Sequence, residues 1–189
     1  MIGLILIGES NSGKSTIGHK IAEISGARYI SSGDIARRMA TTDKERDSLN
    51  SGNMAPEQLM RENILKEIVL GDMIHENDNN AFILDGFPRF EDQYRWLKEN
   101  LSCKLIFAHM YAPYDVILER ARSRGRDDDK SIGIKHQFFI DKTLPMISAI
   151  IDDNNDMYVI HTESNEDKDI KIKLLSDILG GKDANNSQN

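Results

Sequence analysis

The chain has little cysteine and little proline: Cys103 is its single cysteine, and four prolines occur among 189 residues. A lone cysteine excludes an internal disulfide and a zinc site built from several thiolates, and it fits a reducing compartment. No apolar run approaches the roughly 20 residues of a membrane-spanning helix. The apolar run at residues 1–7 lacks a basic flank, so it does not resemble a secretion signal. We therefore expect a cytoplasmic protein with no membrane partner and no zinc.

Basic residues are also fewer than acidic ones: the chain has 24 basic and 31 acidic residues, which gives a net charge of −7. This balance argues against nucleic acid or a membrane surface as a partner. The apolar share of 39% and the charged share of 29% are typical of a globular protein. A chain of this length can form one domain with a substantial core. We expect the polar segment 181–189 to be disordered.

Short apolar segments alternate with segments of helical spacing along the chain. The predicted strands are Ile2–Ile7, Arg28–Ile30, Ala81–Leu84, Lys104–Tyr111 and Met157–His161. The predicted helices are Lys14–Ser25, Ile35–Ala40, Pro56–Asn77, Glu91–Asn100, Tyr114–Arg124, Ile132–Asp153 and Glu166–Leu179. This alternation predicts an α/β fold with a five-stranded parallel sheet, and ligands then bind beyond the carboxyl ends of the strands. Pro145 should kink the long helix that contains it.

Residues 8–15 read Gly-Glu-Ser-Asn-Ser-Gly-Lys-Ser, which matches G-x-x-x-x-G-K-[ST] between a predicted strand and a predicted helix. Gly8 and Gly13 allow the backbone to curl until several N–H groups point at one anion, and the helix N-terminus adds its dipole. Lys14 can then reach the β- and γ-phosphates of a nucleotide, and the Ser15 hydroxyl can lie near Mg²⁺. The alternative is an ordinary Gly/Ser-rich turn, but a chance match directly after the first strand is rare.

Asp85 ends the third predicted strand and should lie beside this glycine loop. In phosphoryl transfer, a carboxylate at that place holds Mg²⁺ directly or through water. The alternative is a turn or helix-capping residue, since Asp85 precedes a glycine and Asp-Gly is a common turn signal.

Several arginines could bind the phosphates of the nucleotide at the glycine loop and of a second phosphate-bearing substrate. Arg120 and Arg124 are spaced i, i+4 and share one helix face, whereas Arg122 is expected at the surface. Arginine binds phosphate oxygens through two nitrogens at once, so such a face suits a nucleotide. The alternative is a solvated helix end balanced by the acidic residues at 127–129. The five histidines are scattered without ligand spacing, and we interpret them as surface or internally satisfied residues.

Four segments in order resemble the nucleoside monophosphate kinases, and most closely the adenylate kinases. They are residues 8–16, residues 29–37, residues 82–89 with Gln93, and residues 120–129. The sequence Asp-Gly-Phe-Pro-Arg at 85–89 is the most specific of them. The resemblance implies a three-layer P-loop NTPase fold with a five-stranded parallel sheet over residues 1–180. Within it, residues 1–30 and 72–180 would form the core, residues 31–71 a helical insert that binds the monophosphate, and residues 124–130 a very short lid.

The resemblance also implies site residues, Mg²⁺ and ATP. The implied ATP-binding residues are Asn11, Ser12, Gly13, Lys14, Ser15, Thr16 and Arg120. The implied AMP-binding residues are Ser32, Arg37, Asn53, Met54, Ala55, Gly86, Arg89, Gln93 and Arg124. The implied catalytic residues are Lys14, Arg89, Arg120, Arg124 and Arg126, and Mg²⁺ would be held by Ser15 and Asp85, possibly through water.

The implied reaction is ATP + AMP ⇌ 2 ADP by direct in-line transfer, carried out by a monomer whose partners are small-molecule nucleotides. Gln93 accompanies adenine in this family, and Ser32 keeps a hydroxyl that adenine-specific members carry. Members also carry a phosphate-binding arginine in the helix after the lid, where this chain has Lys135, His136 and Gln137. Two alternatives follow: a kinase for UMP, CMP or another small acceptor, or a catalytically weak nucleotide-binding regulatory or assembly protein of the same fold.

Overall fold

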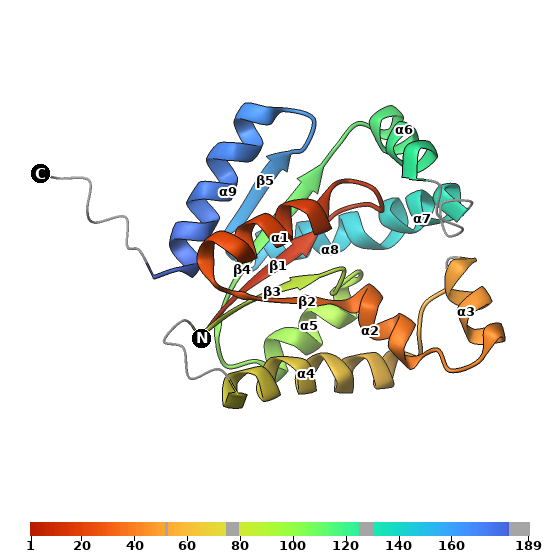
Figure 1. The fold of residues 1–189 in the computed structure, drawn as a ribbon, viewed down its shortest axis with the longest axis horizontal. Coiled ribbons are helices and arrows are strands. Elements are labelled where there is room, and N and C mark those ends of the chain that lie inside the picture. The colour runs from red at the N-terminus through yellow and green to blue at the C-terminus, as the bar shows by residue number, and fades with distance from the viewer. Residues whose placement is uncertain (52, 75–79, 125–130, 182–189) are drawn as a thin grey trace, which may run out of the picture.

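The computed structural model describes residues 1–51, 53–74, 80–124 and 131–181 (Figure 1). Most of the predicted lid, including Arg126, and nearly all of the predicted disordered tail therefore lie outside the described residues. One parallel sheet has the strand order β2–β3–β1–β4–β5, which confirms the predicted fold class. Its strands are β1 Ile2–Ile7, β2 Arg28–Ser31, β3 Ala81–Asp85, β4 Lys104–Tyr111 and β5 Met157–His161.

Helices cover both faces of the sheet (Figure 1). They are α1 Lys14–Ser25, α2 Ser32–Met39, α3 Asp43–Asn50, α4 Glu57–Ile74, α5 Glu91–Asn100, α6 Tyr114–Arg124, α7 Ile132–Phe138, α8 Leu144–Asp152 and α9 Asn165–Leu179. In the part of the chain that the structure describes, no helix is both long and apolar enough to cross a membrane.

The alternation of side chains along β1 produces two separate cores. Leu4 and Leu6 point to one face, where α1 and α9 contribute residues such as Ile21 and Leu175. Ile5 and Ile7 point to the other face, where α2, α4, α5 and α8 supply a second buried cluster. A strand that is buried on both faces must be apolar at every position, which explains the continuous apolar run at the start of the sequence.

The helical insert between β2 and β3 contains α2, α3 and α4. Helix α2 begins at Ser32, three residues before the predicted start, because the Ser31 side chain accepts a hydrogen bond from the Asp34 N–H and caps the helix. Helix α3 was not predicted. Thr42 and Glu45 form its capping box, in which each side chain accepts from the backbone of the other.

The helix predicted over Ile132–Asp153 is interrupted by a π-helical segment, η2, at Phe139–Thr143. The N–H of Leu144 bonds to the carbonyl of Phe139, five residues earlier. Pro145 then falls in the first turn of α8, where its missing N–H costs no helical hydrogen bond. The structure therefore shows a change of helical register before the proline, and the kink at Pro145 stays a prediction.

Candidate active site

The glycine loop connects β1 to α1 and surrounds the ammonium group of Lys14. Gly8 and Gly13 have positive φ values of 153° and 97°, which side chains rarely adopt. The Lys14 Nζ donates hydrogen bonds to the carbonyls of Gly8 at 2.9 Å and Glu9 at 2.6 Å. Burial lowers the pKa of Lys14, and the nearby Asp85 carboxylate opposes this shift. The curled loop thus holds a cation in the position that the motif predicts.

Asp85 lies beside this loop because β3 pairs directly with β1, with Leu6 opposite Asp85. Its Oδ2 accepts hydrogen bonds from the Ser15 hydroxyl at 3.0 Å and from the Tyr29 hydroxyl at 2.5 Å. The residue is 6% exposed, and its Oδ1 is buried without a hydrogen-bond partner. A free carboxylate oxygen next to a serine hydroxyl fits Mg²⁺, which takes oxygen ligands from one or two side chains together with substrate phosphates.

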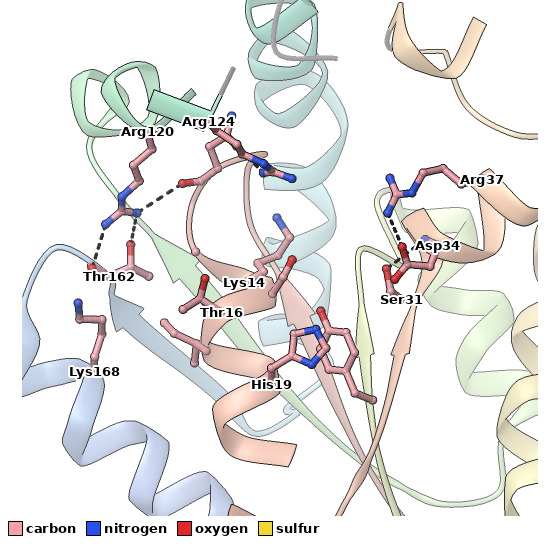
Figure 2. A pocket seen from close by; sticks show the side chains of 15 residues that line it. Lys14, Thr16, His19, Ser31, Asp34, Arg37, Arg120, Arg124, Thr162 and Lys168 are labelled. Atoms are coloured by element: carbon pink, nitrogen blue, oxygen red, sulfur yellow. Dashed lines mark hydrogen bonds and ion pairs between the residues drawn. The ribbon is translucent and has the colours of Figure 1, made fainter. Parts of the chain in front are cut away.

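A cavity of about 560 Å³ opens above the loop (Figure 2). Two arginines of α6 reach toward the loop from the opposite wall. Arg120 donates to the Thr162 hydroxyl at 2.9 Å and carbonyl at 3.0 Å, and Arg124 donates to the Asn11 side chain at 2.7 Å. Six of the seven residues predicted for ATP line this cavity: Asn11, Gly13, Lys14, Ser15, Thr16 and Arg120. The seventh, Ser12, is fully buried.

A second cavity of about 110 Å³ also has Lys14 in its lining. Its walls include Lys14, Met54, Gly86, Arg89 and Lys135. Burial lowers the pKa of Arg89, the Asp85 carboxylate opposes that shift, and the Arg89 Nε donates to the Gly86 carbonyl at 2.8 Å. Lys14 lines both cavities, so the two cavities share this residue.

Gln93 bonds to the backbone of Arg89. Its Oε1 accepts a hydrogen bond from the Arg89 N–H at 2.7 Å, and its Nε2 donates to Glu57 at 2.8 Å. Gln93 is 1% exposed. Ser32 is 4% exposed, and its hydroxyl is buried without a partner. The Ser32 hydroxyl is therefore unsatisfied and lines neither of the two cavities, whereas both ends of the Gln93 amide bond to protein groups.

The family model described as adenylate kinase matches residues 6–154. The chain belongs to the adenylate kinase family. A relative from Synechocystis, adenylate kinase 1, is 30% identical over 77% of this chain and 81% of its own length. The adenylate kinases of Trichodesmium erythraeum and Mycolicibacterium vanbaalenii are 29% and 30% identical, over 82% and 76% of this chain and 91% and 83% of their own lengths. Membership in the adenylate kinase family confirms the resemblance and identifies a phosphotransferase with a phosphate group as acceptor.

The structure divides the residues predicted for the acceptor of this adenylate kinase family member. Met54, Gly86 and Arg89 line the smaller cavity, whereas Arg37 and Arg124 line the larger one. The Arg37 side chain is 59% exposed and forms an ion pair with Asp34 at 2.5 Å. Figure 2 shows this pair on α2, across the larger cavity from Lys14. Neither of these two cavities is lined by the other four residues of the set, Ser32, Gln93, Asn53 and Ala55. Asn53 bonds to Ser48, and Ala55 packs on the core.

Two contacts of the site were not predicted for this adenylate kinase family member. His136 of α7 approaches Glu9 of the loop, with 2.6 Å between Nδ1 and Oε2, and its ring stacks on Tyr114 at 4.0 Å. The hydrogen bond from Tyr29 to Asp85 is the second. An acidic residue inside the phosphate-binding motif was the available signal for a nearby cation or donor, but nothing in the spacing of His136 connects it to Glu9.

Proposed function

We propose that the chain is an adenylate kinase that catalyses ATP + AMP ⇌ 2 ADP with Mg²⁺. The observation that carries this proposal is that Lys14 lines both cavities. ATP in the larger cavity and AMP in the smaller one would bring their phosphates together at this ammonium group. A site for a hydrolase would need the first cavity alone. The guanidinium of Arg89 in the lining of the second cavity supports an anionic acceptor.

In the proposed mechanism, a phosphate oxygen of AMP attacks the γ-phosphorus of ATP directly, and ADP leaves in line. The attacking oxygen is already anionic at neutral pH, so no side chain needs to act as a base. Lys14 and Arg89 neutralise the transferred group from two sides, and Arg120 and Arg124 hold the donor phosphates. Arg126 belongs to the same proposed set of cations. Mg²⁺ held by Asp85 and Ser15, directly or through water, would neutralise further phosphate charge.

The acceptor would be enclosed by movement of α2, α3 and α4, the proposed insert at residues 31–71. This movement would carry the free Ser32 hydroxyl and Arg37 toward AMP and exclude water, which would otherwise hydrolyse ATP. The backbone at residues 53–55 would flank the base, and Gln93 would bind its edge. The proposed enzyme acts as a cytoplasmic monomer, since one chain lines both cavities and its single cysteine suits a reducing compartment.

The replacement Lys14→Met tests the proposal. Loss of the ammonium group should lower the rate of ADP formation by at least about 100-fold, as expected when a preorganised cation is removed from a transition state. The protein should still unfold cooperatively on heating, because the lysine contacts loop carbonyls and no core side chain.

Lys20→Met is the matched control. Lys20 lies on the same helix, is exposed, and forms only a surface ion pair with Asp169 at 3.2 Å. The control should keep the rate of the unchanged enzyme. Activity that survives in Lys14→Met would contradict the assignment of the loop as the donor site.

A further inference from the structure

The Asp85 carboxylate is held on one side only. Both of its hydrogen bonds, from Ser15 at 3.0 Å and from Tyr29 at 2.5 Å, end on Oδ2, while the buried Oδ1 has no partner. A buried carboxylate oxygen without a hydrogen bond is costly unless a ligand satisfies it. Two donors on one oxygen also fix the rotation of the carboxylate, so Oδ1 keeps one direction.

Tyr29 comes from β2, which pairs with β3 so that Tyr29 lies opposite Ile83 and Ser31 lies opposite Asp85. Its ring stacks on His19 of α1, with 3.9 Å between the ring centroids and 32° between the planes. Both rings belong to the lining of the larger cavity, and Figure 2 shows His19 there. The stack holds the phenol from a second direction, independently of its hydrogen bond to Asp85.

The hydroxyl of Tyr29 is a neutral hydrogen-bond donor to Asp85. Its hydrogen bond stabilises the ionised carboxylate without adding a positive charge that would compete with a metal ion.

We propose that Tyr29 is a positioning residue for the divalent cation: by holding Asp85 Oδ2, it directs Oδ1 toward the metal of the nucleotide complex. The proposal rests on the function proposed above, in which Asp85 holds Mg²⁺. Groups that bond to a metal-binding side chain commonly change metal affinity by 10- to 100-fold when they are removed. Tyr29 would contribute to metal binding through Asp85, without being a metal ligand itself.

Tyr29→Phe tests this role, because it removes the hydroxyl and keeps the ring that stacks on His19. Binding of Mn²⁺ to the complex of enzyme and ATP, measured by electron paramagnetic resonance without AMP, should weaken by roughly 10-fold. The Mg²⁺ concentration for half-maximal ADP formation should rise by a similar factor. Tyr158→Phe is the control, since its ring packs on the core around β5 and should leave both values unchanged.

Two results would contradict different proposals. Equal Mn²⁺ affinity in the Tyr29→Phe and unchanged proteins would overturn the positioning role, whatever their rates, because a purely structural defect lowers kcat without changing Mn²⁺ affinity. If the unchanged protein binds Mn²⁺ and ATP but forms no ADP, the proposed function fails. The Mn²⁺ titration alone then decides the role of Tyr29.

Discussion

At the scale of single residues, the site is built around a few opposite charges that offset one another. Loss of surrounding water lowers the pKa of Lys14 and of Arg89, and the Asp85 carboxylate opposes that shift in each. Bound phosphates would offset much more, since they bring several negative charges to the same place. The cations are thus positioned for polyanionic ligands.

In the proposed function, Gln93 is the residue on which the choice of acceptor depends. Gln93→Asn shortens the side chain by one methylene, so its amide can no longer reach Arg89, Glu57 and a base edge in the same geometry. We expect the preference for AMP over CMP, as a ratio of kcat/KM values, to fall by about 3- to 10-fold, the value of one hydrogen bond. Steady-state rates with both acceptors measure this ratio.

Gln58→Asn is the control for that prediction. Gln58 is exposed on α4 and bonds only to Glu62 within the helix, at 3.1 Å. A preference that stays the same in Gln93→Asn would mean that Gln93 supports Arg89 and does not read the base. UMP and CMP would then stand equal to AMP as proposed acceptors.

Residues inside short motifs could be predicted from the sequence, and residues that act through distant contacts could not. Lys14, Ser15 and Asp85 were predicted to lie together because strand ends and loop spacing determine their neighbours. The contacts from His136 to Glu9 and from Tyr29 to Asp85 join residues 127 and 56 positions apart. Such pairs depend on how α7 and β2 pack, which local spacing does not encode.

At the scale of helices and strands, apolar runs predicted the sheet well because every strand spans a buried layer. The unpredicted α3 contains no buried apolar stripe, and its capping box at Thr42 and Glu45 was the only local signal for it. The π-helical segment before Pro145 was predicted as a kink alone. Several backbone geometries can accommodate a proline, and packing against the core selects among them.

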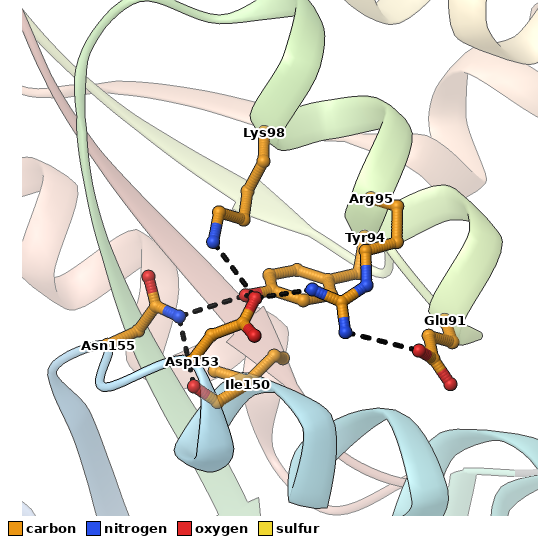
Figure 3. Close-up of polar contacts among 7 residues, drawn as sticks. All are labelled: Glu91, Tyr94, Arg95, Lys98, Ile150, Asp153 and Asn155. Carbon is orange, nitrogen blue, oxygen red and sulfur yellow. Dashed lines mark hydrogen bonds and ion pairs between the residues drawn. The ribbon is translucent and has the colours of Figure 1, made fainter.

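Helices α5 and α8 are joined by hydrogen bonds to Asp153 (Figure 3). Its Oδ2 accepts from Tyr94 at 2.6 Å, Arg95 at 2.5 Å and Lys98 at 2.9 Å. These hydrogen bonds, chiefly those from Tyr94 and Lys98, lower the pKa of Asp153 to about 2, from an ordinary value of 3.8. Because the pKa is lower in the folded state, the stabilisation is complete above pH 3.8 and is lost as the pH falls through 2.

Asp153→Asn should therefore lower the urea concentration at the midpoint of unfolding at pH 7. The difference from the unchanged protein should shrink between pH 4 and pH 2, because the native carboxylate becomes protonated there. Asp152→Asn, at the neighbouring exposed position, is the control and should change the midpoint little. A difference that stays constant down to pH 2 would show that the charge of Asp153 does not stabilise the fold.

At the scale of the whole molecule, the strand order determines where the chemistry can occur. Placing β1 between β3 and β4 brings Gly8, Asp85 and the start of α6 to one edge of the sheet. Within the insert, α3 then lies opposite α6 and α7 across that edge, whereas α4 packs on the core (Figure 1). Two cavities that share Lys14 result from this arrangement.

Formation of ADP from Mg·ATP and each of AMP, CMP, UMP, GMP and dTMP tests the central claim most directly. We expect rapid ADP formation with AMP, at a kcat/KM at least about 10-fold above that of the other acceptors, since the other acceptors would leave buried polar groups of the site without partners. A protein that binds ATP and AMP yet forms no ADP from them would contradict the claim. It would indicate a nucleotide-binding regulatory or assembly protein of the same fold.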